Sequence, residues 1–303
     1  MAQQNFPRLR GKSFTLFAVL LSLLLVVSCA DSNSQYVRKA IRIMDKKGLF
    51  AEGADWESAK AEALSAKPVS LEEAQEIVRT AAKVAGGKHS FLKLAGSVAS
   101  DAASEWPVPE VKFTEGGIPV ISLPPFSGNH DEGIKYASAV LSAIPENVPG
   151  VVIDLRGNTG GDMYPMIAAV HRFLPKDNET LRFRTRKLTM WIPLSNVVRI
   201  TGVQEQSRIE CPVAILTDDH TASSGEAALI CFRGLDYVRV FGVPTAGYAS
   251  ANEPCPLPGG DYLVLTTGCD VARTGEVFCD DPINPDVLTD SPLEDALEWI
   301  SKQ

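Results

Sequence analysis

Residues 221–226 have the composition expected around a nucleophilic serine. The run Thr-Ala-Ser-Ser-Gly-Glu follows an apolar segment, 212–216, and opens a helix-like segment that extends to residue 232. Ser223 therefore stands at the start of a predicted helix, where free backbone amides favour negative charge. Glu226 follows at the spacing of a capping box, so a purely structural helix cap is the alternative interpretation of Ser223.

A second candidate element is the glycine-rich turn at 154–161, Asp-Leu-Arg-Gly-Asn-Thr-Gly-Gly, which ends the apolar strand predicted at 150–155. Glycines allow backbone conformations that leave N–H groups free to bind an anion. Such a turn is common by itself, but its pairing with the serine motif is more specific than either part. Asp154, Arg156 and Asn158 are expected to pin the loop by hydrogen bonds.

Together these motifs resemble those of the S41 family of serine peptidases, which includes the tail-specific or C-terminal-processing peptidases and their tricorn-like relatives. The similarity also covers 55–56, 87–91, 241–247 and 283–286. The resemblance implies an α/β fold: an N-terminal helical bundle packed on an α/β core with a mixed sheet, of the ClpP/crotonase-like kind. It also implies a serine nucleophile that forms an acyl-enzyme and needs no cofactor.

The resemblance assigns the nucleophile to Ser223, which directly follows Thr-Ala, rather than to Ser224. The amide of Ser224 and one glycine amide of the turn would then form the oxyanion hole. Gly161 is preferred for the glycine position, with Gly160 as the alternative.

The chain departs from the processing peptidases in two respects. Those enzymes use a lysine base in a Thr-Phe-Gly-Lys motif, whereas this chain has Thr-Ala-Gly-Tyr at 245–248. The interval 91–111 is also too short for the PDZ domain that many relatives carry. The general base must therefore come from elsewhere.

Histidine is the usual alternative base because its pKa lies near working pH. His89 is followed by Ser90, which matches the place where tricorn-like relatives keep a catalytic histidine beside a serine. We therefore predict that His89 is the general base. His220 is the runner-up, whereas His171 and His130 are expected to be a helical residue and a loop residue.

A histidine base usually needs a partner that fixes its tautomer. Tricorn-like relatives take a carboxylate from just before the final Pro-Asp motif, where this chain has Asp280 and Asp281. Asp281 is preferred, and Glu253 is a further candidate. The alternative is that both aspartates are solvated turn residues. Ser90 is a separate candidate to support His89, which would make a tetrad.

The N-terminus predicts export. Arg8, Arg10 and Lys12 precede an uncharged run, 14–27, that is too short to span a bilayer as a helix. Residues 26–29, Val-Val-Ser-Cys, match a bacterial lipobox. We predict a signal peptide at 1–28, a lipid on Cys29 and an envelope protein anchored to a membrane. An ordinary secretory signal is the alternative.

Composition limits partners and cofactors. The formal net charge of −8 makes nucleic acid an improbable partner. Six cysteines without a Cys-x-x-Cys pair give no zinc pattern, and no other metal site is indicated. Cys269 and Cys279 are spaced to close a hairpin, but the pairing is open.

Apolar periodicity divides the chain into 29–106, a helical bundle of about three helices, and 107–303, the S41-like α/β domain. The segments predicted in the second part are helices at 131–144, 164–173, 223–232 and 293–300, strands at 111–113, 118–123, 150–155, 212–216 and 237–241, and a hairpin within 257–278. Residues 178–210 are not assigned.

The favoured function is a lipid-anchored envelope serine peptidase acting on a peptide or protein through an acyl-enzyme. The alternative is a non-catalytic lipoprotein that binds peptides or apolar ligands on a degenerate S41 scaffold. The missing lysine favours the second, and the retained serine, histidine and double glycine favour the first.

Overall fold

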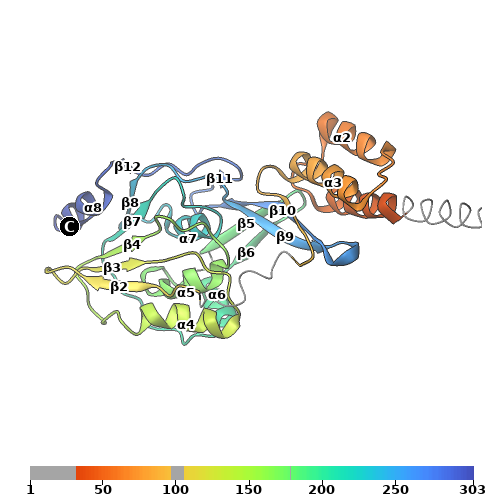
Figure 1. Cartoon of the computed structure of the whole chain (residues 1–303). Coiled ribbons are helices and arrows are strands. Elements are labelled where there is room, and N and C mark those ends of the chain that lie inside the picture. The colour runs from red at the N-terminus through yellow and green to blue at the C-terminus, as the bar shows by residue number, and fades with distance from the viewer. Residues whose placement is uncertain (1–31, 97–105, 178) are drawn as a thin grey trace, which may run out of the picture.

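The computed structural model describes residues 32–96, 106–177 and 179–303. Two six-stranded sheets form the framework, and three helices at the N-terminal end form a separate bundle at one end of the molecule (Figure 1). The α/β class and the N-terminal bundle predicted from the sequence are confirmed. The predicted signal peptide and Cys29 lie outside the described residues. No helix in the described ranges is long and apolar enough to cross a membrane.

The bundle consists of a helix at 32–47, α2 (Gly53–Ser65) and α3 (Leu71–Gly86). Ser70 caps α3 by accepting the amide of Glu73. Buried side chains of the bundle, among them Tyr36 and Trp56, share one apolar cluster with Leu263 and Leu265 of the second sheet. The bundle is therefore packed against the core domain and is not an independent appendage.

The first sheet is mixed and has the strand order β12-β8-β7-β4-β3-β2. Its strands are β2 (Glu110–Phe113), β3 (Pro119–Ser122), β4 (Val151–Asp154), β7 (Val213–Thr217), β8 (Val238–Gly242) and β12 (Val287–Leu288). Only the β2–β3 pair is antiparallel among these. Strands β4 and β7 are apolar except for their last residues, Asp154 and Thr217, because both faces of the sheet are covered.

Alternate residues of the central strands face two different layers. Val151 and Ile153 pack in the cluster that contains one set of helices, whereas Val152 packs with Ala296 and Ile300 of the C-terminal helix. The first set comprises α4 (His130–Leu141), α5 (Met163–Ala169) with the 3₁₀ turn η1 (His171–Phe173), α6 (Leu194–Thr201) and α7 (Ser224–Phe232), and the second is α8 (Pro292–Ile300). Because β3, β4, β7 and β8 are parallel, their carboxyl ends lie at the same edge of the sheet, and α7 begins after the carboxyl end of β7.

The second sheet connects this core to the bundle. Its central strand is β10 (Tyr262–Val271), which pairs with β9 (Ser250–Pro256), β5 (Leu181–Thr185), β1 (Phe91–Lys93) and β11 (Val277–Phe278), and β6 (Thr189–Ile192) extends the sheet beyond β5. The β9–β10 hairpin projects toward the bundle (Figure 1), with the short turn η2 (Pro258–Gly260) at its tip. Strand β1 follows α3 after a short loop and pairs with β10, so residues 91–93 belong to the sheet of the core domain.

The one cysteine pair that the sequence suggested is present. Cys269 of β10 and Cys279, just after β11, form a disulfide, while Cys211, Cys231 and Cys255 are free and buried. This bond joins β10 to the residue that follows β11, so it closes the hairpin formed by these two strands.

Candidate active site

Ser223 occupies a sharp turn between β7 and α7. Its φ is 52°, and it is the only non-glycine residue with positive φ in the described part of the chain. A conformation of this kind costs about 1–3 kcal/mol and persists only where the surroundings impose it. Ser223 is the N-cap of α7 and forms a capping box with Glu226. Ser223 therefore combines the role of a helix cap with a partly buried side chain.

Glu226 is the group that holds this turn. Its fully buried carboxylate accepts hydrogen bonds from the amides of Ser223 (2.8 Å), Gly247 (3.0 Å) and Tyr248 (2.7 Å), and from the hydroxyl of Thr245. Burial raises the pKa of Glu226, and these four hydrogen bonds oppose that rise because they favour the charged form. One side chain thus joins the serine turn to the loop 245–248.

The glycine turn packs directly on the serine. A Cβ on Gly160 would lie 2.7 Å from Ser223 Cβ and 3.0 Å from the amide nitrogen of Ser224, so only glycine fits there. The hydroxyl of Ser224 donates to the carbonyl of Gly161 at 2.6 Å, which fixes the two segments to each other.

The hydrogen bonds of the turn distinguish the two candidate glycines. The amide of Gly160 is already used, since it donates to the side-chain oxygen of Asn158 at 2.9 Å. Across the described ranges, no hydrogen bond uses the amide of Gly161 or that of Ser224. The first amides of a helix have no partner within it. Gly161 and Ser224 therefore offer free donors beside the serine, whereas Gly160 does not.

The remaining residues of the turn have structural contacts. Asn158 donates to the carbonyl of Leu123 at 2.8 Å, and Arg156 pairs with Asp154 at 2.7 Å. The amide of Gly157 donates to Asp218. These side chains shape the loop, as the sequence indicated.

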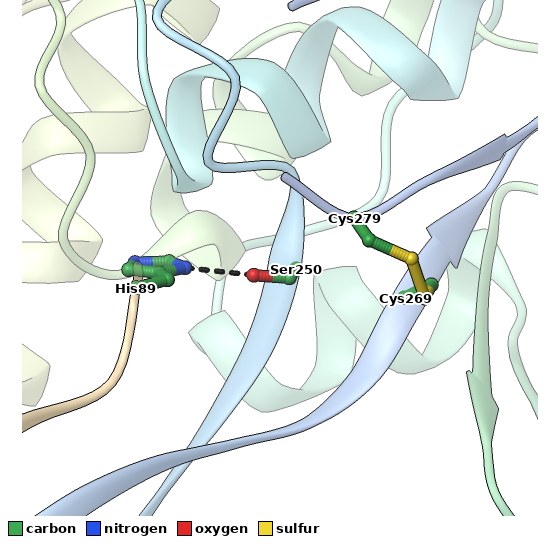
Figure 2. Close-up of a disulfide and its surroundings, with 4 residues drawn as sticks. All are labelled: His89, Ser250, Cys269 and Cys279. Atoms are coloured by element: carbon green, nitrogen blue, oxygen red, sulfur yellow. Dashed lines mark hydrogen bonds between the residues drawn. A yellow bond between two sulfur atoms is a disulfide. The ribbon is translucent and has the colours of Figure 1, made fainter. Parts of the chain in front are cut away.

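His89 lies in the loop between α3 and β1 and is partly buried. Its Nδ1 is 2.9 Å from Ser250 Oγ at the start of β9 (Figure 2). Its ring meets the ring of Tyr248 edge-on, with the centroids 5.2 Å apart. Burial, with a smaller contribution from the Lys88 ammonium, lowers the pKa of His89 to about 4. The imidazole is therefore neutral at neutral pH and able to accept a proton.

Contacts through Tyr248 place His89 and Ser223 in one neighbourhood. The Tyr248 ring touches His89, and the Tyr248 amide shares an oxygen of Glu226 with the Ser223 amide. No hydrogen bond joins His89 to Ser223 in the part of the chain that the structure describes. Catalytic hydrogen bonds are often long or unformed without substrate.

The residues expected to support His89 lie as follows. Ser90 is buried and exchanges hydrogen bonds with Thr266 of β10, at 3.1 and 2.9 Å. Its hydroxyl thus fixes the strand that follows α3. Glu253 pairs with Lys47 of the bundle.

The two neighbouring aspartates differ in their environment. Asp280 accepts the amide of Lys88 at 3.2 Å, one residue before His89. Asp281 is exposed, and its backbone lies against Gly247. Among the described residues neither aspartate is hydrogen bonded to the His89 ring, whose partner is Ser250. Sequence reasoning missed Ser250, because residues 250–256 were not predicted as a strand.

The other histidines are engaged elsewhere. His171 is buried, 2.7 Å from the carbonyl of Ala168, and accepts the amide of Gln206 at 3.0 Å. His220 is exposed and contacts Asp219 at 2.8 Å. His130 begins α4 rather than lying in a loop.

One group in the described ranges has the composition of a metal site: Asp218, Asp219 and His220, with ligand atoms within 4.8 Å. Asp218 already accepts hydrogen bonds from the amide of Gly157 and the hydroxyl of Thr221. Asp219 and His220 are exposed. These contacts account for the three side chains as parts of a turn.

Comparison with known proteins identifies the family of the chain. Residues 117–289 match the sequence profile of peptidase family S41. The nisin-resistance protein of Lactococcus lactis subsp. lactis is 32% identical over 281 residues, 90% of this chain and 88% of that protein. A lipoprotein structure from Streptococcus agalactiae superposes with a TM-score of 0.80 and 29% identity over 89% of this chain and 96% of that one. The photosystem II D1 C-terminal processing protease shares the fold, with a TM-score of 0.61 and 13% identity over 89% of this chain and 97% of that one. Since the profile spans more than half of the sequence, the chain belongs to peptidase family S41.

Proposed function

We propose that this protein is a serine peptidase of the bacterial envelope that hydrolyses peptides through an acyl-enzyme on Ser223. The observation that carries the proposal is the strained serine turn beside two unpaired amides, Gly161 and Ser224. Membership of family S41 supports a serine peptidase, and the similar proteins with a named source are bacterial.

In the proposed reaction, His89 removes the proton of Ser223 Oγ as that oxygen attacks the peptide carbonyl. The amides of Gly161 and Ser224 donate to the oxyanion of the tetrahedral intermediate. His89 then returns the proton to the leaving amine, and the acyl-enzyme forms. Water, activated by the same imidazole, releases the acyl group and restores the serine.

Two candidates exist for the residue that orients His89. The geometry supports Ser250, because its hydroxyl lies 2.9 Å from Nδ1 and leaves Nε2 for the nucleophile. The family resemblance favours Asp281, and that assignment stays a prediction. Ser90 and Asp280 are supporting residues in this proposal, acting on the strand and the loop on either side of His89.

The substrate we propose is a peptide of the kind represented by nisin, because the relative that is similar over nearly its whole length is a nisin-resistance protein. The test incubates the chain lacking residues 1–28 with nisin and follows the products by mass spectrometry. Cleavage by the wild type and none by Ser223→Ala supports the proposal. Intact nisin with both proteins would reject nisin as the substrate, and a library of peptides would then test peptidase activity itself.

A second candidate function is peptide binding without cleavage. It is favoured by the absence of a hydrogen bond between Ser223 and His89 in the described residues and by Tyr248 at the position of the family lysine. Calorimetry separates the two candidates: a non-catalytic binder retains the peptide unchanged, with equal affinity for the wild type and Ser223→Ala.

Membrane attachment through Cys29 is proposed from the lipobox sequence and from the similarity to a streptococcal lipoprotein. Metabolic labelling with an alkyne fatty acid in a bacterial host tests it. The wild type should incorporate the label and partition with membranes, and Cys29→Ala should do neither. Equal labelling of the two proteins would contradict the anchor.

A further inference from the structure

The Cys269–Cys279 disulfide is connected to two of the contacts of the His89 loop, and Figure 2 shows it together with the first of them, that of Ser250 with His89. Cys269 stands directly opposite Ser250 in the register of β10 and β9. Ser250 is the residue whose hydroxyl lies 2.9 Å from His89 Nδ1. The sulfur of Cys269 and the hydroxyl of Ser250 therefore belong to two residues that are direct cross-strand neighbours.

The other sulfur leads to the same loop by a different route. Cys279 precedes Asp280, whose carboxylate accepts the amide of Lys88 at 3.2 Å. Lys88 is the residue before His89. The disulfide thus links the strand next to Ser250, which contacts the His89 ring, to the segment that carries Asp280, which binds the amide of Lys88.

In the described ranges, residues 280–282 make one hydrogen bond, that of Asp280 with Lys88, and the next anchor is Ile283, which is buried and exchanges hydrogen bonds with Thr245. β11 has only two paired positions with β10, Asp270 with Phe278 and Val271 with Val277. Within the described residues, Asp280 Oδ1 is buried without a hydrogen-bond partner. A buried carboxylate oxygen left unpaired is destabilising, so the segment gains by turning Asp280 toward water. A covalent bond at the preceding residue prevents that movement.

We propose that the Cys269–Cys279 disulfide is a redox-sensitive positioning device for His89. With the bond intact, Asp280 and Ser250 hold the histidine loop from two sides. When it is reduced, the segment between β11 and Ile283 is free to shift, and the histidine loop loses the Asp280–Lys88 hydrogen bond, while the hydrogen bond from Asn252 to the His89 carbonyl remains. The catalytic consequence rests on the proposed function, whereas the change in the surroundings of His89 does not.

The reductant is a dithiol. Its thiolate attacks the sulfur of Cys279, which is partly exposed, whereas Cys269 is only 4% exposed. A mixed disulfide forms, and Cys269 leaves as a thiolate that takes up a proton. The second thiol of the reductant then closes its own disulfide and releases Cys279 as a thiol. The protein gains two electrons and two protons, and the dithiol loses them.

The experiment treats the folded wild type with dithiothreitol and verifies reduction by intact mass. Two readouts are followed: the rate of fluorophosphonate labelling of Ser223, and the rate of diethylpyrocarbonate modification of His89. His130, at the start of α4, and His220, in the turn between β7 and α7, serve as internal references. The variant Cys269→Ser/Cys279→Ser is measured with and without the reductant as the matched control.

Reduction should slow labelling of Ser223 by about 10- to 100-fold, the loss expected from a small misplacement of a catalytic group. It should also speed modification of His89 relative to His130 and His220, and reoxidation should reverse both effects. The double-serine variant should behave like the reduced wild type and be insensitive to dithiothreitol.

Unchanged His89 modification in the reduced wild type and in the variant would overturn the proposal. Loss of the whole circular dichroism spectrum on reduction would overturn it as well, because the proposed effect is local. If His89 becomes more reactive while no form labels Ser223, the positioning role stands and the peptidase assignment fails.

Discussion

The backbone amides of Ser223 and Tyr248 donate to the same carboxylate oxygen of Glu226, at 2.8 and 2.7 Å. Their separation is therefore limited to the sum of these two distances. Tyr248 packs its ring against His89, so the strained serine turn and the histidine environment share one buried anchor. Positioning of the nucleophile relative to the base depends on this single side chain.

Replacing that anchor should affect both stability and labelling. Glu226→Gln keeps the size of the side chain but puts an amide donor among four donors, leaving buried groups unpaired. We expect a loss of about 2–4 kcal/mol in the free energy of unfolding and slower fluorophosphonate labelling. Urea denaturation measures the first. Glu115→Gln, at an exposed turn, is the control and should stay within about 0.5 kcal/mol. Equal stability of the two variants would contradict the role of Glu226.

Gly160 tests the fit between the glycine turn and the nucleophile. Both Gly160 and Gly157 have positive φ, but a Cβ would collide with Ser223 only at position 160, and at 157 it meets nothing within 4 Å. Gly157→Ala should cost about 1–2 kcal/mol of backbone strain and keep activity. Gly160→Ala should lower peptide hydrolysis by about 100-fold or more, because it displaces the serine and the adjacent amide. Similar kinetics for both variants would show that the contact does not matter.

Ser250 and Asp281 can be separated as partners of His89. Ser250→Ala removes the hydroxyl beside Nδ1 and should lower kcat by about 10- to 100-fold with little change in KM. Asp281→Asn alters an exposed side chain and should change kcat by less than about twofold. A loss in Asp281→Asn equal to that in His89→Ala would return the orienting role to Asp281.

The pH dependence follows from the environment of His89. Burial, and secondarily Lys88, lowers the pKa of His89 to about 4 from its ordinary value of 6.5. Protonation of the base should therefore make kcat/KM fall on the acid side near pH 4 rather than near 6.5. Lys88→Met removes the nearby positive charge and should move this acid limb upward. An acid limb near 6.5 in the wild type would show that the base is not this imidazole.

The same shift has a consequence for folding. Between pH 6.5 and about 4 the unfolded chain binds the proton and the folded chain does not, so the unfolded state gains stability. The contribution of His89 to the free energy of unfolding should thus be complete above pH 6.5 and decrease as the pH falls toward 4. His89→Gln should weaken this acid dependence in urea titrations; an unchanged slope would indicate an unshifted histidine.

Much of the fold could be predicted because its signals are local. The apolar runs that became β4 and β7, and the helical periods of the bundle, are complete within short stretches of sequence. The segment 178–210 could not be assigned, since β5 is ordered by pairing with the distant strand β10, and β6 by pairing with β5.

The candidate site divides in the same way. The sequence predicted that three residues share one site, because each stands in a short motif of the family: Ser223, Gly160 and Gly161. Ser250 could not be found, because its role depends on where the β9–β10 hairpin carries it relative to a loop far earlier in the chain. The choice between the two glycines also required the structure, which shows Asn158 using the amide of Gly160.

The most direct test of the account is fluorophosphonate labelling of the wild type, Ser223→Ala and His89→Ala, each shown to be folded by circular dichroism. The account predicts labelling at Ser223 in the wild type, none in Ser223→Ala, and at least about 100-fold slower labelling in His89→Ala. Labelling that proceeds equally in all three proteins would contradict it.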